Sequence, residues 1–253
     1  MKIEFMTHRG AVRPQNQDAL QLGDRIWTNL DVPESCKLDT LPLLISVVDG
    51  MGGYRGGEEA AEILACTLAE GANCFAEKID LDEDTRLLNG LLSDACKKMA
   101  AVAHERPELA EMGAAVAGLL IRERTTLAFN CGDCRAYRFS MGELEKLTHD
   151  HSVVQQLFDN EAISEEEMRS HSRKNIVISA IGAKFSEFEL FVKPLSRMKD
   201  DAFFLCSDGV WEALSRKELT SCLSDEAPDA PQKLFDALIR AECHDNVSFI
   251  WVR

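Results

Sequence analysis

The stretch Leu43-Leu44-Ile45-Ser46-Val47-Val48-Asp49-Gly50-Met51-Gly52-Gly53 joins a nearly unbroken apolar run to an acidic residue and a glycine-rich turn. An apolar run rich in valine and isoleucine predicts a buried β-strand. A glycine directly after Asp49 lets the backbone approach a ligand closely, because no Cβ intervenes. The same arrangement recurs where the apolar run Ala202–Cys206 leads to Asp208 and Gly209. One such pair is also typical of an ordinary turn.

Aspartates recur beside other predicted strands. The five that lie at or near strand ends are Asp18, Asp49, Asp133, Asp208 and Asp245. If several carboxylates met in one pocket without Lys or Arg among them, their charges would repel unless a cation lay between them. A ligand set made only of oxygen atoms favours hard ions such as Mg²⁺ or Mn²⁺. The pattern therefore indicates a divalent-metal site, although any one aspartate alone is more often a turn or cap residue.

The predicted secondary structure favours an α+β fold. Eight segments have the apolar and β-branched content of strands: Lys2–Thr7, Leu43–Val48, Ala114–Ile121, Thr126–Asn130, Arg135–Phe139, Glu187–Val192, Ala202–Cys206 and Val247–Val252. Short polar turns after Ile121 and at 140–143 predict antiparallel hairpins. Because a half-buried sheet needs cover, we expect helices to pack on the faces of antiparallel sheets.

Helices are predicted over Glu58–Ala69 and Thr85–Ala103, the second from apolar residues spaced three and four apart. Shorter helices are predicted from their starting residues, which are Ser164, Ser215 and Asp229. We expect one domain over residues 1–253, because no linker or repeat interrupts the pattern. The polar segment 151–184 has few strand-like residues and is expected to stand out from the core.

Composition excludes several classes of protein. The chain has 253 residues, with 28 Lys and Arg against 43 Asp and Glu, and a formal net charge of −15. This acidity argues against nucleic-acid binding, which needs clustered Lys and Arg. The longest apolar run, Met112–Ile121, is about half of the roughly 20 residues that span a bilayer. The sequence Met1–Phe5 has no apolar stretch behind it of the kind that a signal peptide requires.

The nine cysteines favour a reducing, cytoplasmic environment, because their number is odd and most lie in apolar stretches. Cys131 and Cys134 have the C-x-x-C spacing of zinc and redox motifs. No second Cys or His pair stands at a suitable distance for zinc, and no helix is predicted to start there. We therefore expect neither a zinc site nor a redox site at this pair.

Eight segments, taken in order, resemble the metal-dependent PPM-type (type 2C) serine/threonine protein phosphatases in their bacterial form. They are Arg13-Pro14-Gln15-Asn16-Gln17-Asp18, Val48-Asp49-Gly50-Met51-Gly52-Gly53, Met112-Gly113, Cys131-Gly132-Asp133-Cys134-Arg135-Ala136-Tyr137, Leu147-Thr148-His149-Asp150-His151-Ser152, Ile181-Gly182, Cys206-Ser207-Asp208-Gly209 and Asp245-Asn246. One such motif is weak evidence. Eight motifs in the family's order, spread over nearly the whole chain, are specific.

The resemblance implies a four-layer α-β-β-α sandwich, in which two antiparallel sheets are flanked by helices and a flap follows His151, at about 151–184. It also implies a centre of two Mn²⁺ or Mg²⁺ ions, with a third ion in bacterial relatives. Carried over to this chain, the resemblance implies that Asp49 bridges the two metals, that the Gly50 carbonyl is a further ligand and that Asp208 and Asp245 bind the first metal. It implies that Asp18 acts through a metal-bound water and that Asp133 binds the third metal. Arg13 would bind the phosphate, and Asn246 would orient Asp245.

The reaction that the resemblance implies is hydrolysis of phosphoserine and phosphothreonine in proteins. A water or hydroxide that bridges the metals would attack directly, with Arg13, Asp18 and Asp49 as the catalytic set and without a covalent phosphoenzyme. The always-charged guanidinium of Arg13 suits two phosphoryl oxygens. The implied partners are phosphoprotein substrates and an opposing Ser/Thr kinase, and we expect a cytoplasmic monomer with no nucleic-acid or membrane partner.

The chain departs from the family's pattern at several positions. Ala114 and Ala115 stand where two hydroxyl residues are usual, and Met51 stands where some relatives have a histidine proposed as general acid. The segment Ile178-Ser179-Ala180-Ile181-Gly182 lacks the usual Thr-Arg pair, Cys134 replaces a serine, and Lys174 stands where arginine is common in the flap. None of these changes removes a proposed metal ligand, so we expect altered substrate preference rather than loss of activity.

Two alternatives stay open at this level. A catalytically silent relative could bind phosphoproteins as a scaffold, but such a relative would be expected to have lost one of the five aspartates. A metal phosphatase for a small phosphoester would have the same aspartates, because the flap and the surface select the substrate.

Overall fold

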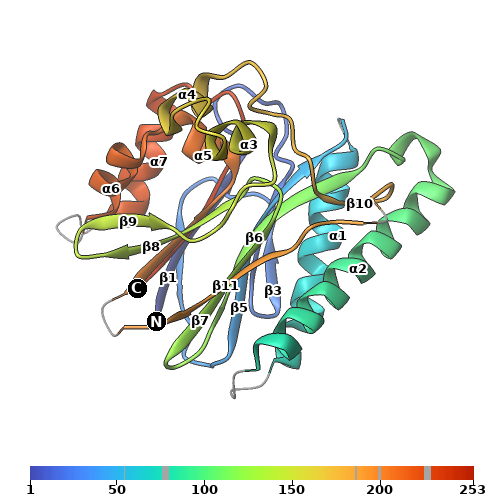
Figure 1. The fold of residues 1–253 in the computed structure, drawn as a ribbon, viewed down its shortest axis with the longest axis horizontal. Coiled ribbons are helices and arrows are strands. Elements are labelled where there is room, and N and C mark those ends of the chain that lie inside the picture. Colours follow the sequence, from blue (N-terminus) through green and yellow to red (C-terminus); the bar gives the residue numbers. More distant parts are fainter. Residues whose placement is uncertain (54, 76–79, 186, 199–200, 225–228) are drawn as a thin grey trace.

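The computed structural model describes residues 1–53, 55–75, 80–185, 187–198, 201–224 and 229–253. Its centre is a pair of antiparallel β-sheets stacked face to face (Figure 1). The first sheet has six strands in the order β4-β1-β13-β12-β8-β9. Their bounds are β1 Lys2–His8, β4 Glu34–Lys37, β8 Arg135–Ser140, β9 Glu143–Lys146, β12 Ala202–Cys206 and β13 Val247–Val252.

The second sheet has seven strands, in the order β11-β7-β6-β5-β2-β3, with the short β10 paired to β6. Their bounds are β2 Asp18–Leu22, β3 Arg25–Trp27, β5 Leu43–Met51, β6 Gly113–Ile121, β7 Thr125–Cys131, β10 Ile181–Gly182 and β11 Phe191–Ser196. The two hairpins predicted from polar turns are confirmed as β6–β7 and β8–β9. The second turn has Met141 and Gly142 at positive φ, as a two-residue hairpin loop requires.

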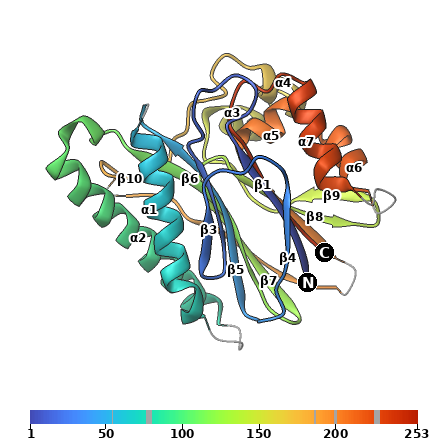
Figure 2. The same ribbon diagram turned by 180° about the vertical axis from the view of Figure 1, so that it is seen from behind.

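Helices cover the outer face of each sheet, which gives four layers (Figures 1 and 2). The helices α1 Gly56–Gly71 and α2 Leu81–Glu105 lie on the seven-stranded sheet. The six-stranded sheet is covered by α5 Asp208–Ala213, α6 Arg216–Leu223 and α7 Ala230–Arg240. The remaining helices, α3 Val153–Asp159 and α4 Glu165–Ser170, lie at one end of the sandwich, and two 3₁₀ turns span Ala72–Cys74 and Pro107–Leu109.

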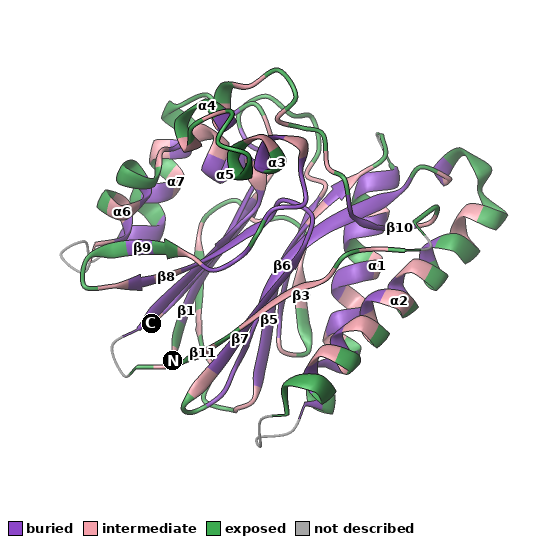
Figure 3. Ribbon diagram, viewed as in Figure 1, coloured by how far each residue is buried: buried purple, intermediate pink, exposed green. Residues whose placement is uncertain are grey.

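Three apolar clusters hold the layers together. One lies between α1, α2 and the seven-stranded sheet and includes Leu64, Leu92 and Val116. The second lies between the sheets, and the third lies under α5, α6 and α7. The strands between these layers are buried, whereas α2, the outer of the two helices, has one buried stripe and an exposed remainder (Figure 3). Burial of apolar surface stabilises by about 25 cal/mol per Å², so the interfaces dominate the stability.

The predicted α+β sandwich is confirmed. Most differences between the predicted and the observed elements concern short strands and strands at the edges of the sheets. Predicted capping boxes are present at Ser164 and Ser215, where each serine exchanges hydrogen bonds with a glutamate three residues on. The prediction of a strand over Glu187–Val192 was wrong in position, because β11 begins at Phe191. The short strands β2, β3, β4, β9 and β10 were not among the predicted strand segments, although the turn at 140–143 predicted the hairpin that contains β9. Among the described residues, no helix has both the length and the apolarity needed to cross a membrane.

Candidate metal centre and substrate cleft

Asp18 and Asp49 occupy directly paired positions on neighbouring strands. Asp18 is the first residue of β2, and its register partner on β5 is Asp49. Side chains alternate along a strand, and Leu20 and Val47, two residues from each aspartate, belong to the cluster between the sheets. The two carboxylates therefore point to the same side, into the space between the sheets at their end.

Asp18 is held from the opposite sheet. Ser207, directly after β12, donates a hydrogen bond from Oγ to Oδ2 of Asp18 at 2.9 Å. The other carboxylate oxygen, Oδ1, is buried and has no hydrogen-bond partner among the described residues. A buried, unpaired carboxylate oxygen costs free energy, so this atom is suited to a water molecule or a cation.

Asp208 is placed by a sharp connection from β12 into α5. Asp208 is the first residue of that helix, where a carboxylate is favoured by the helix dipole. The next residue must be glycine, because a Cβ on Gly209 would lie 2.0 Å from the carbonyl oxygen of Asn246. This close approach brings the start of α5 against the segment that carries Asp245. Likewise, a Cβ on Gly50 would lie 1.9 Å from the carbonyl oxygen of Gly57, so the turn after Asp49 also requires glycine.

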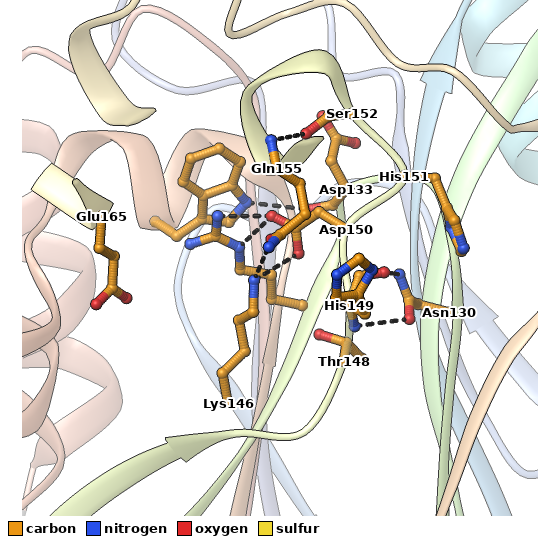
Figure 4. Close-up of polar contacts among 12 residues, drawn as sticks. Asn130, Asp133, Lys146, Thr148, His149, Asp150, His151, Ser152, Gln155 and Glu165 are labelled. Carbon is orange, nitrogen blue, oxygen red and sulfur yellow. Dashed lines mark hydrogen bonds and ion pairs between the residues drawn. The ribbon is translucent and has the colours of Figure 1, made fainter. Parts of the chain in front are cut away.

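Asp133 lies in the β7–β8 connection and is supported by buried polar contacts (Figure 4). Trp211 of α5 donates from Nε1 to the carbonyl oxygen of Asp133 at 3.0 Å. The guanidinium of Arg135 lies 3.6 Å from the ring centroid of Trp211 and binds Asp150 through Nε and a terminal nitrogen, at 2.9 and 2.6 Å. Lys146 also binds Asp150, so two cations neutralise that carboxylate and its pKa is lowered despite the opposing effect of burial.

Arg13 is held by Asp245 on the rim. A terminal nitrogen of Arg13 binds Oδ2 of Asp245 at 2.7 Å. Asn246 fixes the loop that carries Arg13, because its side chain accepts from the Gln17 backbone and donates to the carbonyl oxygens of Arg9 and Gln15. Both Asp245 and Asn246 therefore position Arg13, which extends the role that the sequence predicts for Asn246.

These residues surround an open cleft of about 600 Å³. Its lining includes two sets of residues. One consists of predicted site residues, namely Arg13, Asp49, Gly50, Asp133, Asp208, Asp245 and Asn246, and the other is Asn175, Ile176 and Val177. Asp18, which is paired with Asp49, is buried and does not line the cleft. Among the described lining residues, Arg13 is the only cation, and none is a serine, cysteine or histidine. The chain thus brings seven of the eight predicted site residues to the cleft and the eighth next to it.

The carboxylates influence one another strongly. Burial raises the pKa of Asp49 well above its ordinary value, and the negative charges of Asp208, Asp18, Asp133 and Asp245 raise it further. Burial likewise raises the pKa of Asp208 well above its usual range, with Asp133 and Asp245 adding to it. Contact with Asp49 limits the rise in the pKa of both Asp18 and Asp208. Asp49 therefore lies within reach of both neighbours.

The residues present fit divalent cations. The donors are oxygen atoms, the carboxylates are buried together, and Oδ1 of Asp18 lacks a partner in the described part of the chain. A cation would relieve this repulsion, which is the arrangement that Mg²⁺ or Mn²⁺ prefers. As they stand, no three His, Cys, Asp or Glu side chains of the described residues are arranged to hold a metal ion.

The Cys131 and Cys134 thiols are buried and free. Burial raises the pKa of Cys131 to about 12, and Cys131 Sγ lies 3.6 Å from Ser179 Oγ. Burial also raises the pKa of Cys134 well above its usual range, with the Asp49 charge adding to it. These thiols are therefore poor nucleophiles and poor metal ligands. His151 accepts a hydrogen bond from the Gly132 backbone at Nδ1, a structural role.

Two parts of the site were not predicted. The hydrogen bond from Ser207 to Asp18 joins residues 189 apart in sequence, and no local pattern marks it. The cleft wall at Asn175–Val177 lies in the segment predicted to leave the core, and the polar composition of that segment indicated exposure but not which residues line the cleft. The one sequence feature that could have indicated this wall is the apolar run Ile176-Val177-Ile178, which stands out in an otherwise charged segment.

Comparison with known proteins gives consistent results. The family model for protein phosphatase 2C matches residues 14–240. The serine/threonine phosphatase stp of Listeria monocytogenes is 30% identical over 227 residues, covering 89% of this chain and 84% of that protein. The structure of PppA, a key regulatory component of the T6SS in Pseudomonas aeruginosa, is 28% identical, with a TM-score of 0.79 over 99% of this chain and 96% of that chain.

A further solved structure is the catalytic domain of the serine/threonine protein phosphatase PstP in complex with two manganese ions. Its TM-score is 0.78, and the alignment covers 99% of this chain and 98% of that chain. At 23% identity, this likeness shows the shared fold alone.

Proposed function

The chain belongs to the protein phosphatase 2C family, and we propose that its acidic cleft is the active site of a metal-dependent serine/threonine protein phosphatase. The observation that carries this proposal is the convergence of Asp18, Asp49 and Asp208 at one end of the sandwich, beside Arg13. Phosphomonoesters hydrolyse very slowly without a catalyst, so the cleft must stabilise considerable charge in the transition state.

We propose that the cleft holds two Mn²⁺ or Mg²⁺ ions, with a third at Asp133. Asp49 would bridge the two ions, because Asp18 and Asp208 both lie close to it. The Gly50 carbonyl, Asp208 and Asp245 would complete the set, with Asp18 acting through a water. When bound, such ions lower the pKa of water toward neutrality and neutralise phosphoryl charge.

Arg13 is proposed to bind the phosphoryl group. Asp245 holds one terminal nitrogen of the guanidinium, which leaves its other N–H donors for two phosphoryl oxygens. No serine, cysteine or histidine lines the described part of the cleft. This composition supports direct attack by water without a covalent phosphoenzyme.

The experiment that tests the function uses two substrates and one metal. Turnover of para-nitrophenyl phosphate and of a phosphothreonine peptide should both appear with Mn²⁺ and disappear with EDTA. Turnover of the small ester alone would indicate a small-molecule phosphatase. The absence of turnover with both substrates would contradict the proposal that the protein is a phosphatase.

Further proposals concern the cellular setting. Phosphoprotein substrates follow from the family, and they imply an opposing Ser/Thr kinase. All nine cysteines are free, which supports a reducing, cytoplasmic location. We propose that the whole chain acts as one monomeric domain in which residues 151–184 form the flap.

A further inference from the structure

The cleft has one wall that belongs to the proposed flap. Asn175, Ile176 and Val177 line the same cleft as the aspartates, and none of the three can ligate a metal as a carboxylate would. Ile176 is 46% exposed, although its side chain is apolar. An exposed apolar side chain beside a charged centre is suited to contact a ligand.

The wall is held firmly at its C-terminal end. The backbone of Val153 donates to the Ile176 carbonyl at 2.9 Å, and Ile178 donates to the His151 carbonyl at 2.8 Å. Ser152 and Val177 form an isolated β-bridge. These bonds tie the wall to the segment that follows Asp150.

The N-terminal end of the wall is held by α5. Lys174, the residue directly before the wall, forms an ion pair with Glu212 Oε2. From α4, Arg169 donates to the carbonyl oxygens of Glu212 and Ala213. The two helices lie side by side in both views (Figures 1 and 2). Because α5 begins at Asp208, one short helix carries both a proposed metal ligand and the attachment of the wall.

The Lys174–Glu212 pair is more shielded than the Arg216–Glu165 pair, which also joins this segment to the body. The side chains of Lys174 and Glu212 are 31% and 12% exposed. Arg216 and Glu165, which join α6 to α4, are 46% and 42% exposed and do not line the cleft. A shielded pair holds its geometry better than an exposed one, which contributes little.

We propose that Glu212 is a positioning residue for phosphopeptide binding: through Lys174 it fixes the wall Asn175–Val177, against which the peptide beside the phosphorylated residue packs. The inference rests on the proposed function and extends it to the substrate's polypeptide part. Ile176 supplies an apolar contact, so an apolar residue next to the phosphorylated one suits this wall. A small ester reaches only the metal centre and does not need the wall.

The first test compares two Glu→Gln variants that keep side-chain volume. Glu212→Gln should lower kcat/KM for a phosphothreonine peptide with an apolar neighbour about fivefold more than for para-nitrophenyl phosphate, mainly through KM. Glu165→Gln, the matched control, should leave that ratio unchanged. Equal loss on both substrates, an unchanged ratio in Glu212→Gln, or the same shift in Glu165→Gln would overturn the proposal.

Substitutions of the partner and of the wall separate positioning from general damage. Lys174→Met should reproduce the selective loss, Lys174→Arg should restore the wild-type ratio, and Lys174→Met with Glu212→Gln should be no worse than either alone. Ile176→Ser should show the same selectivity for the peptide. Additive losses, or failure of arginine to substitute, would contradict a shared ion-pair role.

A readout independent of activity completes the test. Hydrogen exchange of the amides in 173–178 should become faster in Glu212→Gln than in wild type and stay unchanged in Glu165→Gln. Wild-type hydrolysis of para-nitrophenyl phosphate tests the proposed function separately. If the wild type were inactive, the phosphatase assignment would fail, whereas the exchange experiment would still report whether Glu212 positions the wall. Unchanged exchange in Glu212→Gln would overturn the proposal.

Discussion

Ser207 and Asp18 join the two sheets at the active end, through a hydrogen bond of 2.9 Å from the serine Oγ to the aspartate Oδ2. Ser207 follows a strand of the six-stranded sheet, and Asp18 begins a strand of the seven-stranded one. The bond occupies one carboxylate oxygen and leaves the other buried and unpaired. It thereby sets which oxygen faces the proposed metals.

Replacing Ser207 by alanine is expected to weaken metal binding. Residues that orient a metal ligand typically contribute 10- to 100-fold to affinity, so Ser207→Ala should raise the Kd for Mn²⁺ by about tenfold. Isothermal titration calorimetry measures the change. The control is Ser221→Ala, which changes an exposed serine on α6 and should leave the Kd for Mn²⁺ unaltered. An unchanged Kd in Ser207→Ala would argue against its orienting role.

Arg13→Ala should raise KM for phosphoester substrates far more than it changes the Kd for Mn²⁺. The guanidinium is placed to bind phosphate, whereas its contact with Asp245 lies on the rim. Arg13→Lys should recover only part of the loss, because an ammonium group cannot bind two oxygens in a fixed fork. Steady-state kinetics and metal titration give the two quantities. A larger effect on metal affinity than on KM would contradict phosphate binding.

Asp208→Asn should reduce turnover by at least about 100-fold while the protein stays folded. It should also raise the thermal stability of the metal-free protein, because it removes a buried charge that neighbouring carboxylates repel. Circular dichroism with EDTA measures the second effect. An active variant would contradict the role of Asp208, and a lower metal-free Tm would contradict the repulsion.

The metal-free protein is expected to lose stability as pH rises from about 5 to 7. The pKa values of Asp18 and Asp133 are each raised to about 7, mainly by burial. In this window the folded protein keeps protons that the unfolded chain has already released, so raising the pH favours unfolding. A loss of about 1 kcal/mol would lower Tm by about 2–4 °C for a chain of this size.

Excess Mn²⁺ should reverse this trend, because the cation binds the ionised carboxylates and competes with protons. Thermal unfolding from pH 5 to 8, with EDTA and with Mn²⁺, measures both slopes. Asp18→Asn should flatten the metal-free slope. Parallel curves with and without the ion would show that these carboxylates do not hold it.

The sequence predicts the main strands and the aspartates at their ends because those signals are local. An apolar run that stops at Asp49-Gly50 indicates both a buried strand and a close approach, and the Gly50 backbone is indeed crowded by Gly57. The capping boxes at Ser164 and Ser215 are equally local. Such features need no knowledge of distant residues.

The edge strands and the tertiary contacts could not be predicted in the same way. The strand β4 is largely exposed and lacks apolar alternation, so nothing in it favours a strand until β1 pairs with it. The strand β11 contains Pro194, which weakens the strand signal but is tolerated because β11 pairs on one side only, with β7. The ion pair of Arg13 with Asp245 joins the two ends of the chain and depends on the complete fold.

The central claim is that these carboxylates share divalent ions, and anomalous X-ray scattering from crystals grown with Mn²⁺ tests it most directly. Two anomalous peaks on either side of Asp49, one of them also bound by Asp208 and Asp245, are predicted. Well-ordered crystals at millimolar Mn²⁺ with no anomalous peak near Asp49 would contradict the account.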